Sequence, residues 1–262
     1  MNERLTEIEQ FLKSKGFTRA TVKTYCSILK KIFTHIGTEF THEQVEQLMT
    51  RLCPSPRTYN LWYAVINFYT KRYLNYSLIF TRSKVEKSLP TYVTRADMNA
   101  MLRTIPNLRH KLAFGMMYLS GMRIGEVCSQ KTENVYLDER VIKIHGKGNK
   151  ERLTFIAKQM FALLEAHIGW LKKNKIKYVF PTYRGHLHER SLQNRLERAR
   201  NDAHIQKEFT CHDLRHSFAI NFLDKTSDLE KLQRILGHSS IRTTQIYTQC
   251  RTVDLKQLAM TL

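Results

Sequence analysis

Six polar side chains in four separate segments could together transfer a phosphoryl group. They are Arg123, Lys147, His212, Arg215, His238 and Tyr247. Arginine guanidiniums can hold the non-bridging oxygens of a phosphate with paired hydrogen bonds and stabilise the charge that develops on it. A tyrosine hydroxyl can be the nucleophile, a histidine can accept its proton, and a lysine can protonate the departing oxygen. The set therefore predicts phosphoryl transfer that needs no metal.

Each of these residues has an ordinary explanation when it is taken alone. Arg123 and Glu126, three residues apart, share a helix face and could form a surface ion pair. Lys147 lies between two glycines and could be a solvated turn residue. His238 could occupy a helix C-terminus, which favours a cation, and Tyr247 could be a half-buried aromatic residue. Only the combination predicts an active site.

Metal-dependent and nucleotide-dependent chemistry are poorly supported by the sequence. His212 and His216 have the i, i+4 spacing of a zinc protease, but Asp213 replaces the longer glutamate and no convincing third ligand is evident. No carboxylate cluster suits a pair of magnesium ions. The Gly146-Lys147-Gly148 segment is not a phosphate-binding P-loop, because no G-x-x-x-x-G-K-[ST] pattern precedes a helix. We expect no metal and no cofactor.

The composition indicates a polyanionic partner. The 262 residues include 43 Lys and Arg against 23 Asp and Glu, a formal charge of +20. Such a surface binds phosphates and releases counterions, but composition cannot separate DNA, RNA and anionic membrane. The apolar stretch 112–122 is too short to span a bilayer, and the charged N-terminus is not typical of a signal peptide. Because the five cysteines are scattered, we expect reduced thiols and a cytoplasmic protein with no membrane partner.

The elements that must position these residues divide the chain into three parts. Apolar periodicity predicts four helices in residues 1–75, with a capping box at Thr41 and Gln44. Residues 76–92 lose the helical period and are interpreted as a linker. Residues 93–262 mix helices with a hairpin around 146–150 and a strand at 178–180. Helices are expected at 94–104, 108–120, 123–130, 158–173, 189–203, 212–223, 228–236 and 241–249, with a second capping box at Ser227 and Glu230.

Four ordered motifs resemble those of the tyrosine recombinases, the phage integrase family, and are most similar to its Xer-type members. Ser120-Gly121-Met122-Arg123 with Glu126 resembles the first arginine box, and Gly146 to Arg152 resembles the lysine hairpin. His212-Asp213-Leu214-Arg215-His216 matches the H-x-x-R-H box. Leu236-Gly237-His238 followed by Thr243 to Thr248 resembles the last histidine and nucleophile box. The resemblance is strong over residues 92–255 and extends to the N-terminal helices only in layout.

The resemblance implies a mainly α fold with a small antiparallel β-sheet. An N-terminal four-helix core-binding domain (1–75) would bind DNA, a linker (76–92) would follow, and a mixed α/β catalytic domain of the tyrosine recombinase and type IB topoisomerase type (93–262) would complete the chain. Double-stranded DNA is the implied partner. The resemblance also implies assembly of four protomers on two DNA sites, or pairing with a related recombinase. A DNA translocase is a further implied partner. Chromosome-dimer resolution and integration or excision of a mobile element remain open.

The same resemblance implies a role for each residue. Tyr247 would attack one DNA strand and form a 3′-phosphotyrosyl link, while Arg123 and Arg215 hold the scissile phosphate. His212 would act as acid and base near Tyr247, and Lys147 would protonate the leaving 5′ oxygen. His238 would donate a hydrogen bond to the phosphate, and Glu126 would be a supporting carboxylate.

The chain departs from the family pattern in two places, and two rival functions remain open. Gln130 stands where an apolar residue is usual, and only 15 residues follow Tyr247, although tail residues 252–262 could still dock a neighbouring protomer. A type IB topoisomerase would share the chemistry but relax supercoils, and a non-catalytic architectural protein would only bind DNA. RNA binding is weaker, because no aromatic-rich sheet motif is present.

Overall fold

Two groups of secondary-structure elements follow one another along the chain. The computed structural model describes residues 1–79, 81–84, 90–146, 151–183, 185–238 and 240–248. The chain divides into two units, Met1–Lys87 and Ser88–Leu262. In the part that the structure describes, no helix is long and apolar enough to cross a membrane.

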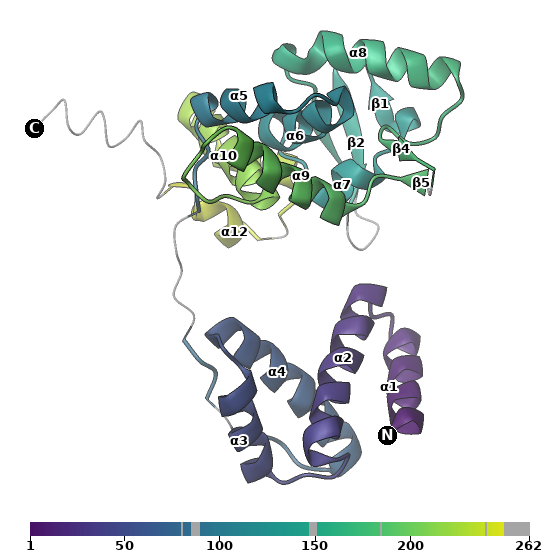
Figure 1. Ribbon diagram of the computed structural model, residues 1–262, viewed down its shortest axis with the longest axis vertical. Helices are drawn as coiled ribbons and strands as arrows, with labels where there is room; N and C mark the ends of the chain where they lie inside the picture. Colours follow the sequence, from purple (N-terminus) through teal and green to yellow (C-terminus); the bar gives the residue numbers. More distant parts are fainter. Residues whose placement is uncertain (80, 85–89, 147–150, 184, 239, 249–262) are drawn as a thin grey trace, which may run out of the picture. The chain divides into compact units, whose positions relative to one another are not determined.

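The first unit is helical, as its periodicity predicts (Figure 1). Thr18 and Ser55 each accept a hydrogen bond from the backbone three residues on, and Thr41 forms the expected capping box with Gln44. These caps satisfy backbone N–H groups that have no partner inside a helix. The helices are α1 (Asn2–Ser14), α2 (Arg19–Ile36), α3 (His42–Leu52) and α4 (Pro56–Tyr69), followed by a π-helical turn over Thr70–Leu74.

The apolar faces of these helices form one core. Tyr69 is fully buried at its centre, and its hydroxyl donates a hydrogen bond of 2.8 Å to the Thr38 carbonyl. This bond gives the phenol a partner where water is excluded. Other fully buried members are Ile8, Leu12, Leu29, Ile32, Val45, Met49, Val65 and Ile66.

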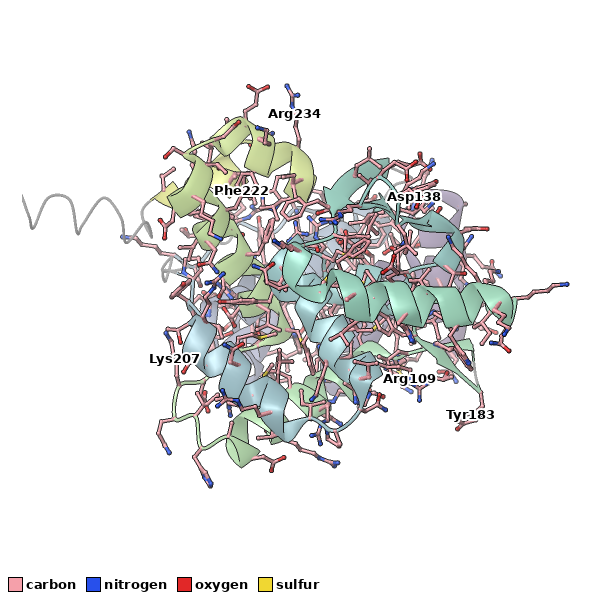
Figure 2. The ribbon with its side chains drawn as sticks, turned by 90° about the horizontal axis from the view of Figure 1, so that it is seen from above. Arg109, Asp138, Tyr183, Lys207, Phe222 and Arg234 are labelled. Atoms are coloured by element: carbon pink, nitrogen blue, oxygen red, sulfur yellow. The ribbon has the colours of Figure 1, made fainter. Side chains whose placement is uncertain are left out.

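The second unit is built around helix α6 (Leu108–Ser120), whose side chains are buried on nearly every side. Helix α10 (Cys211–Thr226) packs along α6 and is also buried over most of its length. In Figure 2, the side chain of Arg234 projects away from this unit. The remaining helices are α5 (Arg95–Thr104), α7 (Ile124–Ser129), α8 (Lys158–Lys173), α9 (Glu189–Asp202), α11 (Leu229–Leu236) and α12 (Arg242–Gln245), with a 3₁₀ turn at Thr132–Asn134.

A small antiparallel sheet completes the second unit, so the expected fold class is confirmed. The sheet has the order β1 (Val135–Tyr136), β2 (Val141–His145) and β3 (Glu151–Phe155). Strand β2 pairs with β3 in the register that joins His145 to Glu151. The predicted hairpin is therefore present, although its tip at 147–150 lies outside the described residues. A separate pair joins β4 (Pro181–Thr182) to β5 (Gly185–His186).

Two local predictions are wrong. Residues 178–180 do not form a strand, because Tyr178 makes only an isolated bridge with Lys131 and pairing resumes at Pro181. Ser227 does not cap α11, because it ends α10 in the left-handed conformation with φ 55°. The side chain of Asp228 makes the cap instead, and its Oδ1 accepts a hydrogen bond of 2.8 Å from the Lys231 amide.

Gly121 makes the turn between α6 and α7 that sets the position of Arg123. Its φ is +67°, and an added Cβ would lie 2.4 Å from the ring of Phe218. Both the left-handed backbone and the close approach of α10 therefore require glycine. The predicted first arginine box begins at a turn that only this residue type fits.

Candidate active site

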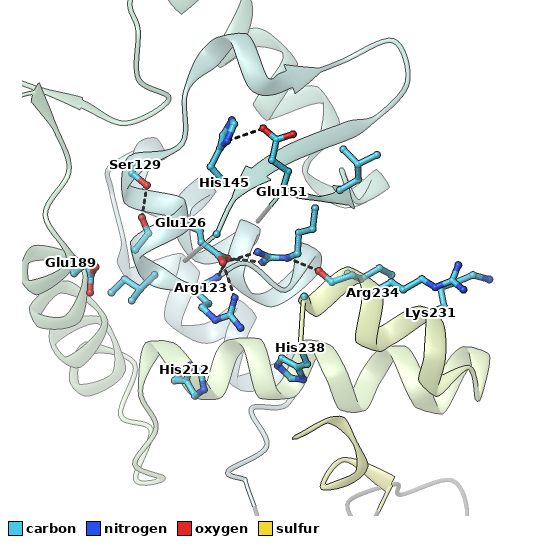
Figure 3. Close-up of a pocket in the computed structure, with 17 residues that line it drawn as sticks. Arg123, Glu126, Ser129, His145, Glu151, Glu189, His212, Lys231, Arg234 and His238 are labelled. Atoms are coloured by element: carbon cyan, nitrogen blue, oxygen red, sulfur yellow. Dashed lines mark hydrogen bonds and ion pairs between the residues drawn. The ribbon is translucent and has the colours of Figure 1, made fainter. Parts of the chain in front are cut away.

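A pocket of about 1170 Å³ opens in the second unit (Figure 3). Its walls come from the start of α7, the ends of β2 and β3, the first turn of α10 and the last turn of α11. Segments far apart in the sequence therefore meet here. The lining includes Arg123, Glu126, Arg152, His212 and His238.

Glu126 is the centre of a buried ionic network, and not half of a surface ion pair. Its side chain is only 8% exposed. Arg123 donates to it from the backbone amide at 2.7 Å, which is the N-cap contact of α7, and from Nη1 at 2.8 Å. Burial alone would raise the pKa of the Glu126 carboxyl. The hydrogen bonds and charge of Arg152 and Arg123 outweigh burial and hold that pKa below its usual range.

Arg152 connects three parts of the site. Its guanidinium donates two hydrogen bonds to Glu126, at 2.7 and 2.6 Å, in the paired geometry that arginine favours with carboxylates. Its Nε donates to the Ile235 carbonyl at 2.8 Å. The side chain passes beneath Gly237, where an added Cβ would lie 2.6 Å from its Cδ. Arg152 thus fixes the end of α11, immediately before His238.

Arg215 lies behind the pocket and is only 1% exposed. Its guanidinium donates to the carbonyls of Gly121 at 2.6 Å and Leu236 at 2.7 Å. These carbonyls end α6 and α11, and helix C-termini carry partial negative charge that favours a cation. Burial, followed by the nearby Arg123, lowers the pKa of Arg215 to about 9, so it stays charged at neutral pH. Three of its five N–H donors have partners among the described residues.

His238 links Arg215 to Thr244, three residues before Tyr247. Its Nε2 lies 3.2 Å from Nη2 of Arg215, and its Nδ1 lies 2.9 Å from Oγ1 of Thr244. Because arginine only donates, we assign Nε2 as the acceptor and place the ring proton on Nδ1. Burial and then the charge of Arg215 lower the pKa of His238 to about 4, which agrees with a neutral ring.

Tyr247 is buried beside the H-x-x-R-H box at the start of α10. It is 2% exposed, and its Oη lies 2.7 Å from Nδ1 of His216. The ring of His238 lies on a second side of Tyr247, with centroids 6.5 Å apart. Tyr247 therefore lies beside two histidines, His216 and His238. The hydroxyl's histidine partner is His216, whereas the sequence pointed to His212.

His212 lines the pocket one helical turn before His216. The two rings meet edge to face with centroids 4.4 Å apart. Burial and the positive charge of Arg215 lower the pKa of His212. The two histidines do not form a metal site with other groups: the described residues contain no cluster of three or more His, Cys, Asp or Glu side chains that could hold an ion.

Most of the predicted site residues come together, and three unpredicted residues join them. Arg123, Glu126, His212 and His238 line the pocket, with Arg215 and Tyr247 buried behind it, while Lys147 lies outside the described residues. Sequence reasoning missed Arg152 as a ligand of Glu126, His216 as the partner of the tyrosine, and Thr244 as the partner of His238. All three lie inside motifs already noted, but the partners of Arg152 and His216 are distant in sequence. Gln130, the departure from the family pattern, is buried and donates to the Lys143 carbonyl at 3.1 Å.

The fold and the site define a protein of the class that breaks and rejoins DNA through a tyrosine. Residues 91–252 match the phage integrase family. The chain belongs to that family, and its similarity to Xer-type tyrosine recombinases extends over nearly its whole length.

Two curated relatives illustrate the similarity. Tyrosine recombinase XerC of a Shewanella species is 30% identical over 97% of this chain and 92% of the relative. Tyrosine recombinase XerA of Pyrococcus horikoshii is 28% identical over 97% of this chain and 91% of the relative. The predicted family is therefore confirmed, including the Xer-type likeness.

Solved structures share the fold at lower identity. XerH site-specific recombinase bound to a palindromic difH substrate, in a post-cleavage complex, superposes with a TM-score of 0.74 and 22% identity over 97% of this chain and 84% of that one. A lambda integrase tetramer bound to a Holliday junction gives a TM-score of 0.75 and 16% identity over 96% and 77%.

Proposed function

We propose that this tyrosine recombinase cleaves and rejoins duplex DNA at a specific site through a 3′-phosphotyrosyl intermediate on Tyr247. The observation that carries the proposal is the burial of the Tyr247 hydroxyl in the cluster of Arg215, His216 and His238, directly behind a basic pocket. A phosphodiester in the pocket would meet Arg123 from one side and the Arg215 cluster from the other.

The reaction balances without an external energy source. The Tyr247 oxygen loses its proton and forms a bond to phosphorus, and the bond from phosphorus to the 5′ oxygen breaks. Lys147 gives that oxygen a proton, Arg123 and Arg215 hold the non-bridging oxygens, and His238 contacts the phosphate. His212 is the proposed acid and base, by family resemblance. Attack by the 5′ hydroxyl of a partner strand reverses these steps and restores a phosphodiester.

The assembly and the biological role are part of the same proposal. Four protomers on two DNA sites would exchange strands in pairs, alone or with a related recombinase and a DNA translocase, in the cytoplasm. The relatives' names support this: one is a recombinase bound to difH, and another is an integrase tetramer bound to a Holliday junction. Both chromosome-dimer resolution and integration or excision of a mobile element fit this chemistry. Residues 1–75 would bind DNA together with residues 93–262.

A covalent-trap experiment tests the chemistry. Wild type and Tyr247→Phe are incubated with sheared genomic DNA of the source organism, denatured in SDS and trimmed with nuclease. Mass spectrometry then identifies the modified residue, and the attached DNA is sequenced. We expect a nucleotide on Tyr247 at a recurring site in the wild type alone.

Each other outcome selects a rival function. Adducts scattered over many sequences would indicate a topoisomerase-like activity. A comparison of plasmid relaxation with strand exchange on paired sites would then measure it. No adduct, with equally tight DNA binding by both proteins, would indicate an architectural role. Strand exchange by Tyr247→Phe would contradict the proposed nucleophile.

A further inference from the structure

His216 is the hydrogen-bond partner of the proposed nucleophile. Its Nδ1 lies 2.7 Å from Oη of Tyr247, within the ordinary range for an O–H···N bond. A phenol in water has a pKa of about 10 and is protonated at neutral pH, so the hydroxyl is the donor. The imidazole nitrogen is then the acceptor, and it lies where a proton leaving the oxygen would go.

The surroundings keep the His216 ring neutral and able to accept. Burial is the main cause that lowers the pKa of His216 to about 4. On its own helix it faces His212 and Arg215, whose charges lower the pKa further, and Asp213, which raises it. From the segment after α11 it faces Tyr247. A neutral ring at pH 7 has a lone pair on one nitrogen, and the tyrosine occupies that position.

His212 and His216, the two histidines of the H-x-x-R-H box, have different positions. They are one turn apart on α10, and their rings touch edge to face. His212 lines the pocket where a phosphate would bind, whereas His216 contacts the buried hydroxyl behind it. Tyr247 is 2% exposed, so a side chain already in contact with its hydroxyl is better placed than bulk water to take its proton at neutral pH. His216 is a protein side chain in hydrogen-bonding contact with that hydroxyl, and its ring nitrogen can take the proton.

We propose that His216 is a catalytic residue, the base that takes the proton of Tyr247 during cleavage and returns it during rejoining. The proposal rests on the function proposed above and narrows the role of His212 to the phosphate side of the pocket. In cleavage, the O–H bond of Tyr247 breaks as its oxygen bonds to phosphorus, and the proton moves to Nδ1 of His216. In rejoining, the imidazolium gives that proton back to the departing phenolate oxygen.

The neighbouring Arg215 gives this base a dependence on DNA. Without a phosphate nearby, the charge of Arg215 disfavours a cationic His216. A bound phosphodiester adds negative charge beside Arg215 and favours the imidazolium. Proton transfer from the tyrosine is thereby favoured when a phosphate is present to be attacked.

Single-turnover cleavage by His216→Asn tests the proposal. The duplex is the site recovered from the covalent trap, and the signal is the SDS-stable adduct. Asparagine places a hydrogen-bonding atom close to the position of Nδ1, so it can hold the hydroxyl but cannot carry its proton. We expect cleavage to slow by about 10²–10³-fold at pH 7, within the range of general base catalysis, with DNA affinity and melting temperature unchanged.

The pH profile separates a base from a structural contact. In His216→Asn the rate should rise about tenfold per pH unit up to pH 9.5, because hydroxide then removes the phenol proton. The wild-type rate should rise much less over the same range. His216→Phe, which removes the hydrogen bond as well, should be slower still, and His212→Asn should not show the same recovery at high pH.

Three results would overturn the inference without touching the proposed function. Cleavage by His216→Asn at the wild-type rate would make His216 dispensable or a hydrogen-bonding contact alone. Faster cleavage would make it a restraint on the tyrosine. A loss that is equal at pH 7 and pH 9.5 would assign the defect to structure. By contrast, a wild type that forms no adduct at all would contradict the proposed function itself.

Discussion

The interiors of the two units contain different kinds of buried side chain. In Met1–Lys87, the buried side chains are apolar apart from Thr70, as far as the described residues extend. The second unit buries two charged side chains, Glu126 and Arg215, at 9% and 1% exposure, together with several polar ones. A charge is costly to bury unless it is paired and hydrogen-bonded. The second unit therefore depends on its site for stability, and the first does not.

This difference predicts opposite sensitivities. An apolar core responds to changes of volume and is largely indifferent to pH. A core built around a glutamate and guanidiniums responds to the loss of a single charge, because the remaining partner is left buried and unpaired. Tests that act on charge should separate the two units.

Acid should have the largest effect. Burial lowers the pKa values of four histidines, all in the second unit: His110, His212, His216 and His238. The unfolded chain takes up these protons near pH 6.5, whereas the folded unit does not until lower pH, near 4 for His216 and His238. The free energy of unfolding should therefore fall as the pH drops from 6.5 to 4. Glu126, whose pKa is lowered, adds stability that is lost below about pH 4.5.

Pulse proteolysis in urea at pH 7 and pH 4.5 measures this, with peptides assigned to each unit by mass spectrometry. The urea midpoint of the second unit should fall more than that of the first. Equal falls of the urea midpoint in both units would mean that the two units do not differ in their response to acid.

Glu126→Ala should be the most damaging single substitution in the buried ionic network. It leaves Arg152 and Arg215 without their carboxylate, and the free energy of unfolding should fall by about 3–5 kcal/mol. Glu9→Ala is the matched control, because it breaks an exposed ion pair with Lys13 in the first unit and should cost about 0.5 kcal/mol or less. Urea unfolding at pH 7 compares the two. Similar losses would mean that the buried network stabilises no more than a surface pair.

Gly121→Ala and Gly16→Ala form a matched pair across the units. Both glycines have positive φ, +67° and +75°, so each alanine carries about 1 kcal/mol of backbone strain. At Gly16 no other atom lies within 4 Å of the added Cβ, whereas at Gly121 the Cβ meets Phe218 at 2.4 Å. Overpacking should add about 1–3 kcal/mol there. Thermal unfolding would contradict this if the two variants lost equal stability.

Arg152→Lys should have the smallest effect on stability and a clear effect on the site. Lysine keeps the charge but loses the paired contact with Glu126 and the Nε bond to Ile235. We expect a loss of about 1.5–3 kcal/mol, the usual value of a hydrogen bond to a charged group. Adduct formation should slow because the segment before His238 is less constrained. Arg103→Lys, in the last turn of α5, is the control and should change neither property. Unchanged cleavage by Arg152→Lys would show that the connection is not needed.

Local signals made most of the fold predictable. Helix α8 occupies 158–173 as expected, because its apolar period is unbroken, and the Thr41 cap needs only residues three apart. The strand predicted at 178–180 was wrong because three apolar residues before a proline satisfy the pattern of a strand, while pairing depends on a partner that the pattern does not contain.

Only the contacts of the site that lie within a single motif could be predicted from the sequence. Arg123 is the N-cap of α7 and Glu126 is the third residue of that helix, so their contact follows from a spacing of three residues. The contact between Arg152 and Glu126 joins residues 26 apart, and that between His216 and Tyr247 joins residues 31 apart. No local period encodes such pairs. They depend on how α10, α11 and the hairpin pack, which the chain determines only as a whole.

The guanidiniums around Glu126 also make DNA a thermodynamic partner of folding. Arg123, Arg152 and Arg215 surround one carboxylate, so the cluster carries excess positive charge. Any phosphodiester that binds the folded cluster and not the unfolded chain raises the free energy of unfolding by mass action, by about 2.7 kcal/mol at a hundred times the dissociation constant. The second unit thus reaches its full stability on its substrate, and a cell that supplies DNA also supplies part of the protein's resistance to unfolding.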